Sequence, residues 1–257
     1  MAEFGEHPPI PDSIENLLSD DTVSTAFLKA ECPTRVKSGH ISSLTLNQLD
    51  DSPWDKPTLE NLCDELSMVI EQNSKRSDCF IEIERIGCKI MQIGDLRITC
   101  AWPPFSDAWE ITIVRPVAHL QISDYNLNPE LMDRLKDHHR GVFVVGRPGS
   151  GKTTFAQAIA AYLDSEVGAM VKTMEAPRDL QVPQRITQYA PLEGDLEKTA
   201  EVIFLVRPDF VIFDEVRRTR DFEIFGDVRL AGVGLLGVTH ANSALEAIQR
   251  MVGKVEL

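Results

Sequence analysis

Apolar and polar residues follow different periods along the chain, and the changes of period divide it into three regions. Residues 1–52 have no sustained period, because prolines, an acidic pair and many Ser and Thr residues interrupt the apolar positions. This composition predicts a mostly extended lead-in. Residues 53–118 combine one helical period with several strand periods, and residues 119–257 alternate short apolar runs with helical patterns. We therefore expect a lead-in followed by two folded domains.

A helix and a small antiparallel sheet are predicted for the second region. Between Lys56 and Gln72 the apolar residues recur three and four positions apart, as on one face of a helix. Stretches with strand-like alternation follow, separated by turns at Gly87 and Gly94; they are CFIEIER, CKIMQIG, LRITCAW and WEITIVRP. The expected domain is therefore a small α+β domain.

Parallel strands that alternate with helices are predicted for the third region. The predicted strands cover residues 141–145, 169–174, 209–214 and 235–239, and the predicted helices cover residues 152–164 and 195–205. The first strand, GVFVV, has the continuous apolar character of a strand that is buried on both faces. This alternation is typical of an α/β nucleotide-binding core.

A phosphate-binding loop joins the first of these strands to the helix that follows. Residues 146–153 match the pattern G-x-x-x-x-G-K-[ST] at every fixed position, and the order strand, loop, helix disfavours a glycine-rich turn that binds nothing. Glycines let backbone N–H groups face an anion, with the positive end of the helix dipole behind them. Lys152 is expected to reach the outer phosphates, and the Thr153 hydroxyl to ligate Mg²⁺. The predicted nucleotide-binding residues are Gly146, Arg147, Pro148, Gly149, Ser150, Gly151, Lys152, Thr153 and Thr154.

Two acidic residues follow the apolar run FVIF in the predicted strand over residues 209–214. Asp214 is expected to hold the Mg²⁺ shell, directly or through water, and Glu215 to orient and polarise the water that attacks the γ-phosphate. An apolar run that ends in Asp-Glu is also a common strand end. Its position after a strong phosphate loop favours the functional interpretation, and with it hydrolysis over simple binding.

Further polar residues lie at the ends of neighbouring predicted strands. Glu175 ends VKTME and His240 ends LLGVTH, so both are expected at the carboxyl edge of the sheet, where ligands bind in folds of this kind. A His at a strand end is more often structural, but here it could donate a hydrogen bond to the γ-phosphate. Arg217, Arg218 and Arg220 follow the acidic pair. They fit a solvated turn with local salt bridges as well as charge neutralisation at the site or at a subunit interface.

Amino-acid composition indicates the cellular location of the chain and the kinds of ligand it can bind, but not its activity. The chain has no apolar run long enough for a membrane span and no signal-peptide pattern at its N-terminus, so we expect a cytoplasmic location. Its five cysteines are irregularly spaced without a C-x-x-C pair, which argues against a disulfide framework and a zinc site. A formal charge of −14 repels polyanions, so any contact with nucleic acid needs a local basic patch.

Four sequence boxes resemble those of the ATPases of type II and type IV secretion and of PilT-like retraction motors. In order they are the phosphate loop, the acidic box TMEAP at 173–177, Asp214-Glu215 with Arg217, and the His box GVTHAN at 237–242. Within this superfamily the chain is most similar to the archaeal ATPases that join a PIN domain, a PilT-like motor and a KH domain, the PINA type. The phrases that carry this likeness lie between residues 79 and 257 and include FIEIER, KTMEAPRDLQVP and LVRPDFVIFDEVRRTRDFEIF.

The resemblance implies a fold, cofactors and roles for single residues. The fold would be α/β, a RecA-like P-loop NTPase core preceded by a small α+β domain, and the chain would hydrolyse ATP with Mg²⁺. Glu215 would be the main acidic residue of the hydrolytic site, Glu175 a catalytic or water-positioning acid, and His240 the γ-phosphate sensor. An arginine that completes the site of a neighbouring subunit is also implied, and Arg115 is the best candidate.

The resemblance also implies partners. It suggests a homo-hexameric ring that acts on DNA or RNA, as in the archaeal relatives, where branch migration or unwinding is implied. A pilus or secretion motor is an alternative, as is a non-catalytic nucleotide-binding or assembly module. The chain has no counterpart of the PIN and KH domains or of the last strands of the motor. We therefore expect an exposed sheet edge that a partner could complete.

Overall fold

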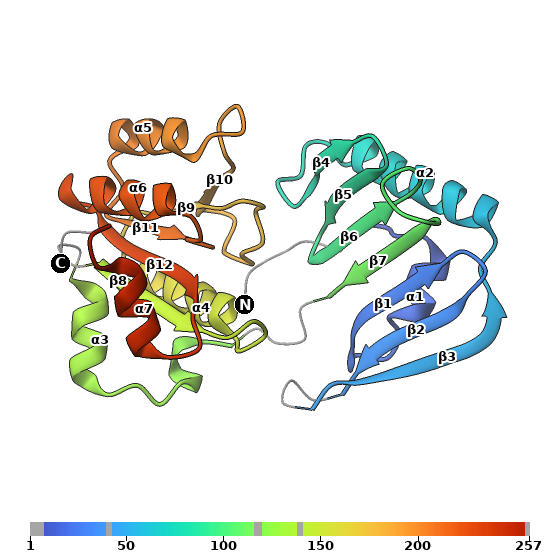
Figure 1. Ribbon diagram of the computed structural model, residues 1–257, viewed down its shortest axis with the longest axis horizontal. Coiled ribbons are helices and arrows are strands. Elements are labelled where there is room, and N and C mark those ends of the chain that lie inside the picture. Colours follow the sequence, from blue (N-terminus) through green and yellow to red (C-terminus); the bar gives the residue numbers. More distant parts are fainter. Residues whose placement is uncertain (1–7, 40–42, 116–119, 138–140, 255–257) are drawn as a thin grey trace. The chain divides into compact units, whose positions relative to one another are not determined.

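A computed structural model describes residues 8–39, 43–115, 120–137 and 141–254. The chain divides into an N-terminal unit, Met1–Ala118, and a C-terminal unit, His119–Leu257 (Figure 1). This division coincides with the boundary expected between the second and third regions, and it falls on residues 116–119, outside the described residues. Within the described parts of the chain, none of the helices combines the length and the apolar character needed to cross a bilayer.

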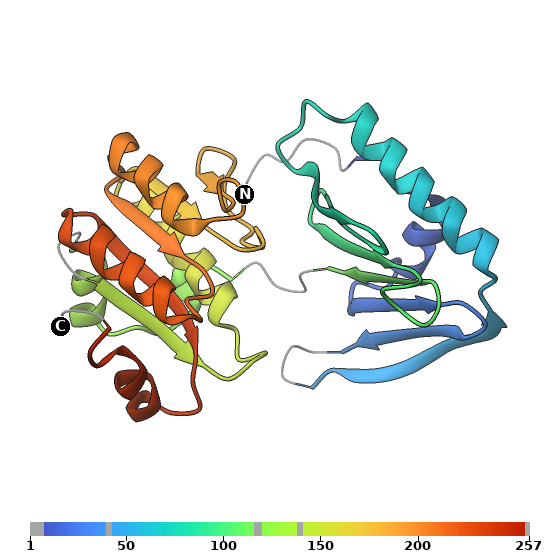
Figure 2. The same cartoon turned by 45° about the horizontal axis from the view of Figure 1, so that its top comes forward.

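One antiparallel sheet of seven strands, in the order β3-β2-β1-β7-β6-β5-β4, organises the N-terminal unit. Two helices, α1 (Asp12–Leu17) and α2 (Lys56–Gln72), pack against the same face of it (Figure 2). The strands are β1 (Val23–Lys29), β2 (Pro33–Ser38), β3 (Thr45–Pro53), β4 (Cys79–Arg85), β5 (Cys88–Ile93), β6 (Leu96–Ala101) and β7 (Glu110–Val114).

The helix α2 forms where the apolar period predicted it. Its first turn is capped by the Asp55 carboxylate, which accepts a hydrogen bond of 2.7 Å from the Thr58 amide, and Pro57 lies in the first turn, where its missing N–H costs nothing. Leu59 and Leu66 are fully buried and belong to the same hydrophobic cluster as Ile98 and Ile113 of the sheet. Burial of this apolar stripe supplies most of the stability of such a helix.

The expectation of an extended lead-in over residues 1–52 is wrong, because β1, β2 and most of β3 lie within it. The register of β1 shifts between Val23 and Thr25, which breaks the strict alternation that marks a strand. All nine residues of β3 are exposed, so β3 has no buried face and no apolar period. The apolar period of the sequence therefore does not predict β1 or β3.

Five parallel strands in the order β10-β9-β11-β12-β8 form the sheet of the C-terminal unit. Alternate residues of β11 point to opposite faces, so that Ile212 packs with α3 and α4 while Phe213 packs with α5, α6 and α7. The strands are β8 (Gly141–Gly146), β9 (Val171–Met174), β10 (Thr187–Tyr189), β11 (Phe210–Phe213) and β12 (Gly234–His240). The helices are η1 (Ile122–Asp124), α3 (Pro129–Lys136), α4 (Lys152–Ser165), α5 (Leu196–Val206), α6 (Thr219–Leu230) and α7 (Ala244–Met251).

All six elements predicted for this unit are present, and the first strand packs on both faces, with Val142 and Val144 against one hydrophobic cluster and Phe143 and Val145 against the other. Among the described residues β8 pairs with β12 alone and forms an edge of the sheet. Its residues Val142–Val145 are consequently only partly buried. An edge strand has one side without a neighbouring strand to cover it, whatever its sequence.

Candidate functional site

Four loops meet at the carboxyl edge of the parallel sheet, because parallel strands all end on the same side. In register, Met174 of β9 lies beside Phe213 of β11, and Phe213 lies beside Gly237 of β12. At the far end of β12, His240 pairs with Gly146 of β8. The phosphate loop, Glu175, the Asp214-Glu215 pair and His240 therefore follow adjacent strands. The predicted convergence of these side chains at one edge is thus present in the structure.

The phosphate loop has the backbone that an anion site requires. Gly149 and Gly151 have φ angles of 73° and 81°, the left-handed region that glycine adopts at little cost. A Cβ on Gly146 would lie 2.5 Å from Oγ of Ser150, so any larger residue here would force the Ser150 side chain to move. Gly151 is also the N-cap of α4, and it offers no side-chain cap to the first amides of the helix. These amides are left to bind an anionic ligand.

Lys152 is held at the mouth of the loop. Its ammonium group donates a hydrogen bond of 2.8 Å to the Arg147 carbonyl, and its side chain is largely buried. Burial lowers the pKa of Lys152, whereas the nearby carboxylates of Asp214 and Glu215 raise it. A partly desolvated cation in this position is well suited to bind phosphate oxygens.

Asp214 is a buried carboxylate with one unpartnered oxygen among the described residues. The residue is 3 % exposed, and among the described residues its Oδ1 has no hydrogen-bond partner. Burial, together with the charges of Glu175, Glu215 and Asp179, raises the pKa of Asp214 to about 7. A carboxylate in such surroundings is stabilised by a divalent cation, so Asp214 and the Thr153 hydroxyl fit a Mg²⁺ ion bound together with a nucleotide.

Glu215 lies in a tight turn directly after β11. Its φ of 62° is in the left-handed region, which costs a non-glycine residue about 1 kcal/mol or more. The turn is fixed from both sides, because the Val216 amide donates to the Val238 carbonyl and the Thr239 hydroxyl donates to the Val216 carbonyl at 2.7 Å. The backbone thereby directs the Glu215 carboxylate toward His240 and Arg217.

His240 and Arg217 are the immediate partners of Glu215. Arg217 forms an ion pair with the Glu215 carboxylate, and His240 Nε2 lies 3.9 Å from Glu215 Oε1. Burial, and then the charge of Lys152, lowers the pKa of His240, so the ring is neutral at neutral pH. Among the described residues its Nδ1 is buried without a partner. A neutral imidazole can donate one hydrogen bond to a ligand without adding charge.

Glu175 is fully buried and both of its oxygens are occupied. Oε1 accepts hydrogen bonds from the Thr173 hydroxyl and, at 3.0 Å, from the Gln188 amide. Oε2 accepts from the backbone amides of Asp179 and Leu180 at 2.6 and 2.8 Å. Burial still raises its pKa, although these hydrogen bonds oppose the rise. In this conformation Glu175 fixes the loop after β9 and adds negative potential at Asp214.

Supporting residues escaped the sequence analysis. Thr173 and Gln188 bind Glu175, and Thr239 holds the turn at Glu215. Thr173 and Thr239 are polar residues buried within apolar strands next to predicted site residues. That pattern is a usable signal, because a buried hydroxyl needs a hydrogen-bond partner. Gln188 carries no such signal, since it is half-buried in the short strand β10.

The arginine cluster is divided between two surroundings. Arg217 pairs with Glu215 at the site. Arg220, the second residue of α6, forms ion pairs with Glu197 of α5 and with Glu223. These ion pairs on the helix surface agree with the interpretation of local salt bridges. Asp221 caps α6 by accepting hydrogen bonds from the amides of Arg217 and Arg218.

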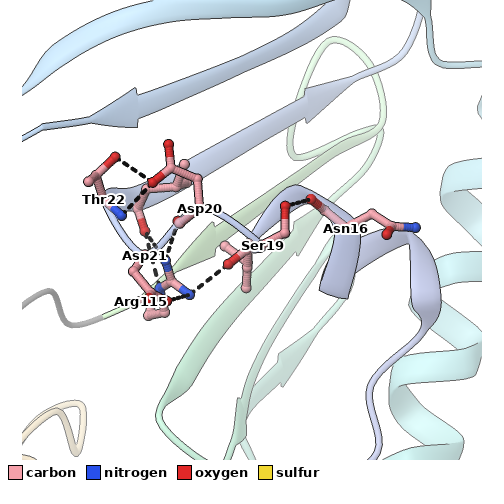
Figure 3. A network of polar contacts seen from close by, with 8 residues as sticks. Asn16, Ser19, Asp20, Asp21, Thr22 and Arg115 are labelled. Atoms are coloured by element: carbon pink, nitrogen blue, oxygen red, sulfur yellow. Dashed lines mark hydrogen bonds and ion pairs between the residues drawn. The ribbon is translucent and has the colours of Figure 1, made fainter.

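Arg115 lies at the end of β7 and binds its own unit. Its guanidinium donates to the carbonyls of Leu18, Asp20 and Val23 at 2.8, 2.6 and 3.0 Å, and the side chain is 16 % exposed (Figure 3). Its backbone amide donates to the Ser24 carbonyl. These hydrogen bonds fasten the turn between α1 and β1 to the strand that leads toward the C-terminal unit.

Replacing Asp214 by asparagine should change how stability depends on pH. An unfolded Asp titrates near pH 4, whereas folded Asp214 titrates at about 7, so the folded protein holds an additional proton between these values. This group therefore makes the free energy of unfolding fall as pH rises through that window, by up to roughly 1.4 kcal/mol per pH unit. Without Mg²⁺ or nucleotide, urea unfolding should show Asp214→Asn gaining stability over the wild type as pH rises. The exposed control Asp227→Asn should follow the wild type, and parallel profiles for all three proteins would contradict the buried-acid assignment.

Comparison with known proteins agrees with this geometry. The sequence profile of one family, described as Type II/IV secretion system protein, matches residues 111–254. A KH and PIN-domain containing protein of Methanocaldococcus jannaschii, itself uncharacterized, is 49% identical over 238 residues, which cover 93% of this chain and 36% of that protein. The Holliday junction branch migration ATPase PINA of Sulfolobus acidocaldarius is 36% identical over 238 residues, which cover 93% of this chain and 46% of that protein. The chain thus spans less than half the length of either relative.

Solved structures of ATPases share the fold of this chain at low sequence identity. The pilus retraction motor PilT with bound ADP superposes with a TM-score of 0.71 at 16% identity, covering 97% of this chain and 72% of that one. The ATPase DotB of Legionella pneumophila gives a TM-score of 0.65, also at 16% identity, covering 98% and 72%. This likeness confirms the expected fold class, a RecA-like core preceded by a small α+β domain.

Proposed function

The chain belongs to the Type II/IV secretion system protein family, and from this membership and the geometry of the strand ends we propose that it is the motor part of a Mg²⁺-dependent ATPase. The observation that carries the proposal is the buried Oδ1 of Asp214, for which the described residues provide no hydrogen-bond partner, together with the glycine-rich phosphate loop. A protein that only needed a stable turn would gain nothing from burying an unpaired carboxylate.

Each site residue has a role in the proposed reaction. Backbone amides of the phosphate loop and Lys152 would bind the phosphates, while Thr153 and Asp214 would hold Mg²⁺. The ion would neutralise charge on the phosphate oxygens when bound. Glu215 would orient and polarise the attacking water, and His240 would donate a hydrogen bond to the γ-phosphate. Glu175, whose oxygens are occupied, would act by positioning the loop after β9 and by its negative potential.

The proposed assembly is a homo-hexameric ring in the cytoplasm that acts on DNA or RNA. The chain is 36% identical, over 93% of its length, to a branch migration ATPase, and this similarity supports nucleic acid as the substrate along which the motor moves. A pilus or secretion motor is the second candidate, supported by the likeness to PilT. Arg217, paired with Glu215 but largely exposed, would be able to contact the γ-phosphate or a neighbouring subunit.

Arg115→Ala tests whether this arginine acts across subunits or within its own unit. Loss of the hydrogen bonds to three carbonyls should lower the free energy of unfolding by about 2–4 kcal/mol, measured by urea titration. Arg85→Ala, at an exposed position, should change it by less than about 0.5 kcal/mol. If Arg115 also completes a neighbouring site, kcat should fall under conditions where the variant stays folded. An unchanged unfolding curve would contradict the structural role.

The proposed function is tested by measuring ATP hydrolysis with Mg²⁺ at several protein concentrations, with and without branched DNA. Lys152→Ala serves as the control that cannot bind the phosphates. We expect a specific activity that rises steeply with concentration, is stimulated by branched DNA and is lost in Lys152→Ala. Hydrolysis without stimulation by DNA would favour the secretion-type motor. Binding of ATP without turnover would make this chain a nucleotide-binding module, and turnover of GTP alone would refute the assignment of ATP.

A further inference from the structure

The sheet of the N-terminal unit has one face packed by helices and one that is only partly covered. Residues of β1 alternate between buried and partly exposed, and the same alternation continues through β2, β6 and β7. The buried set faces α1 and α2 in one hydrophobic cluster. The opposite set includes Thr25, Phe27 and Lys29 of β1, Arg35 and Lys37 of β2, Arg97 and Thr99 of β6, and Thr112 of β7. We call this set the open face.

Strand register brings basic, aromatic and hydroxyl side chains together on the open face. One row across the sheet consists of Arg35, Phe27, Thr112 and Thr99, which are successive register partners. In the adjacent row, Lys37 is the partner of Thr25. Side chains opposite each other on neighbouring strands are about 5 Å apart, so these groups form one continuous surface.

Phe27 and Lys37 are already in contact. The Lys37 ammonium lies 5.6 Å from the centre of the Phe27 ring, within the range of a cation–π interaction. The Phe27 ring is partly exposed and lies outside the hydrophobic cluster beneath the sheet. Arg35 and Lys37 are both exposed. The ring and the two cations therefore face solvent together.

Charge is separated between the two sides of this unit. The outer surface of α2 presents Asp64, Glu65 and Glu71, all exposed. On the open face the strands carry Lys29, Arg35, Lys37 and Arg97, together with the acidic Glu110, which accepts from Thr112. Lys29 is ion-paired with Asp107 at 2.9 Å and Arg97 donates to Gln92, so Arg35 and Lys37 are the exposed cations that carry the positive charge of this face. A chain with a net charge of −14 thus collects basic residues on the surface that also carries an exposed aromatic ring. This separation is the local basic patch that an acidic protein needs in order to bind a polyanion.

We infer that the open face binds single-stranded nucleic acid, an inference that rests on the proposed action on a nucleic-acid track. Arg35 and Lys37 contact phosphates, a base stacks on Phe27, and the threonine hydroxyls bind the sugar-phosphate backbone. An open sheet with a surface aromatic ring suits unstacked bases, because every base has a flat face. A duplex offers no free base face to such a sheet, so unpaired strands are preferred over duplex DNA.

The test is fluorescence anisotropy of labelled oligo-dT and of a duplex of equal length, without ATP, on the whole chain. Arg35→Glu with Lys37→Glu should weaken binding to oligo-dT at least tenfold and flatten its salt dependence. The control Lys56→Glu with Lys75→Glu makes the same charge change at exposed positions on the helical side and should stay within twofold. Phe27→Leu should weaken binding roughly tenfold, whereas Phe27→Trp should preserve it. Circular dichroism verifies that each variant is folded.

Several results would overturn the inference. They are equal weakening by both double reversals, preference for duplex, and absence of oligo-dT binding by the wild type. If the reversal at Arg35 and Lys37 changes the sedimentation of the protein but leaves DNA binding intact, the open face is an interface between copies of the chain. ATP hydrolysis measured in parallel separates the two proposals, because a chain that hydrolyses ATP without binding oligo-dT keeps the motor function and loses only this site.

Discussion

Glu215→Gln should lower kcat for ATP hydrolysis by about 10²- to 10⁴-fold while leaving ATP binding nearly unchanged. The amide keeps the shape of the side chain in its left-handed turn but cannot accept a proton from water. The substitution does not alter the phosphate loop, so the affinity for ATP should be retained. Steady-state phosphate release and binding of a fluorescent ATP analogue measure the two quantities separately.

The matched control for this prediction is Glu201→Gln, on the exposed side of α5. It makes the same chemical change outside the site and should keep the wild-type kcat. A Glu215→Gln protein with wild-type turnover would remove Glu215 from the chemistry. If affinity fell together with kcat, Glu215 would instead be serving the bound ion or the fold of the turn.

Glu175→Ala should be the most destabilising single change at the site, lowering the free energy of unfolding by about 3–5 kcal/mol. The substitution leaves two backbone amides, one amide side chain and one hydroxyl without their acceptor in a buried place. Glu175→Gln should lose less, because one oxygen remains, but its NH₂ group must face either the two backbone amides or Thr173 and Gln188. Urea unfolding of the three proteins measures the order.

The control for Glu175 is Glu197→Ala, which removes an exposed ion pair with Arg220 and should cost no more than about 1 kcal/mol. If Glu175→Gln lost turnover while retaining full stability, Glu175 would be a group that acts on the attacking water. Equal stability of all Glu175 variants would show that the buried network does not hold the loop after β9.

The sequence correctly predicts those parts of the structure that depend on residues close together in the chain. The helix α2 has the predicted bounds because its apolar period matches the stripe of residues that it buries. The site residues follow strand ends, so their positions could be inferred from the apolar runs before them. Lys152, Asp214, Glu215 and His240 meet because parallel strands all end at one edge.

Hydrogen bonds to backbone atoms could not be predicted, because they leave no pattern of residue types in the sequence. Arg115 binds the carbonyls of Leu18, Asp20 and Val23, which every residue possesses, so no residue type marks its targets. The strand β3 is specified by pairing with β2 rather than by a buried face. The edge position of β8 depends on which strands are its neighbours, and its apolar sequence contains nothing that marks an edge strand.

The position of β8 also affects how nucleotide binding is measured. Within the described part of the chain, β8 is held by hydrogen bonds along one side only, whereas β11 lies between two strands. Amide protons of β8 that point away from β12 should therefore exchange with solvent faster than those of β11. The phosphate loop follows directly from this less protected strand, so nucleotide binding should also order β8. The free energy needed to order β8 reduces the net free energy of nucleotide binding. Slower exchange along β8 would then report occupancy of the loop, even in a variant that cannot hydrolyse what it binds.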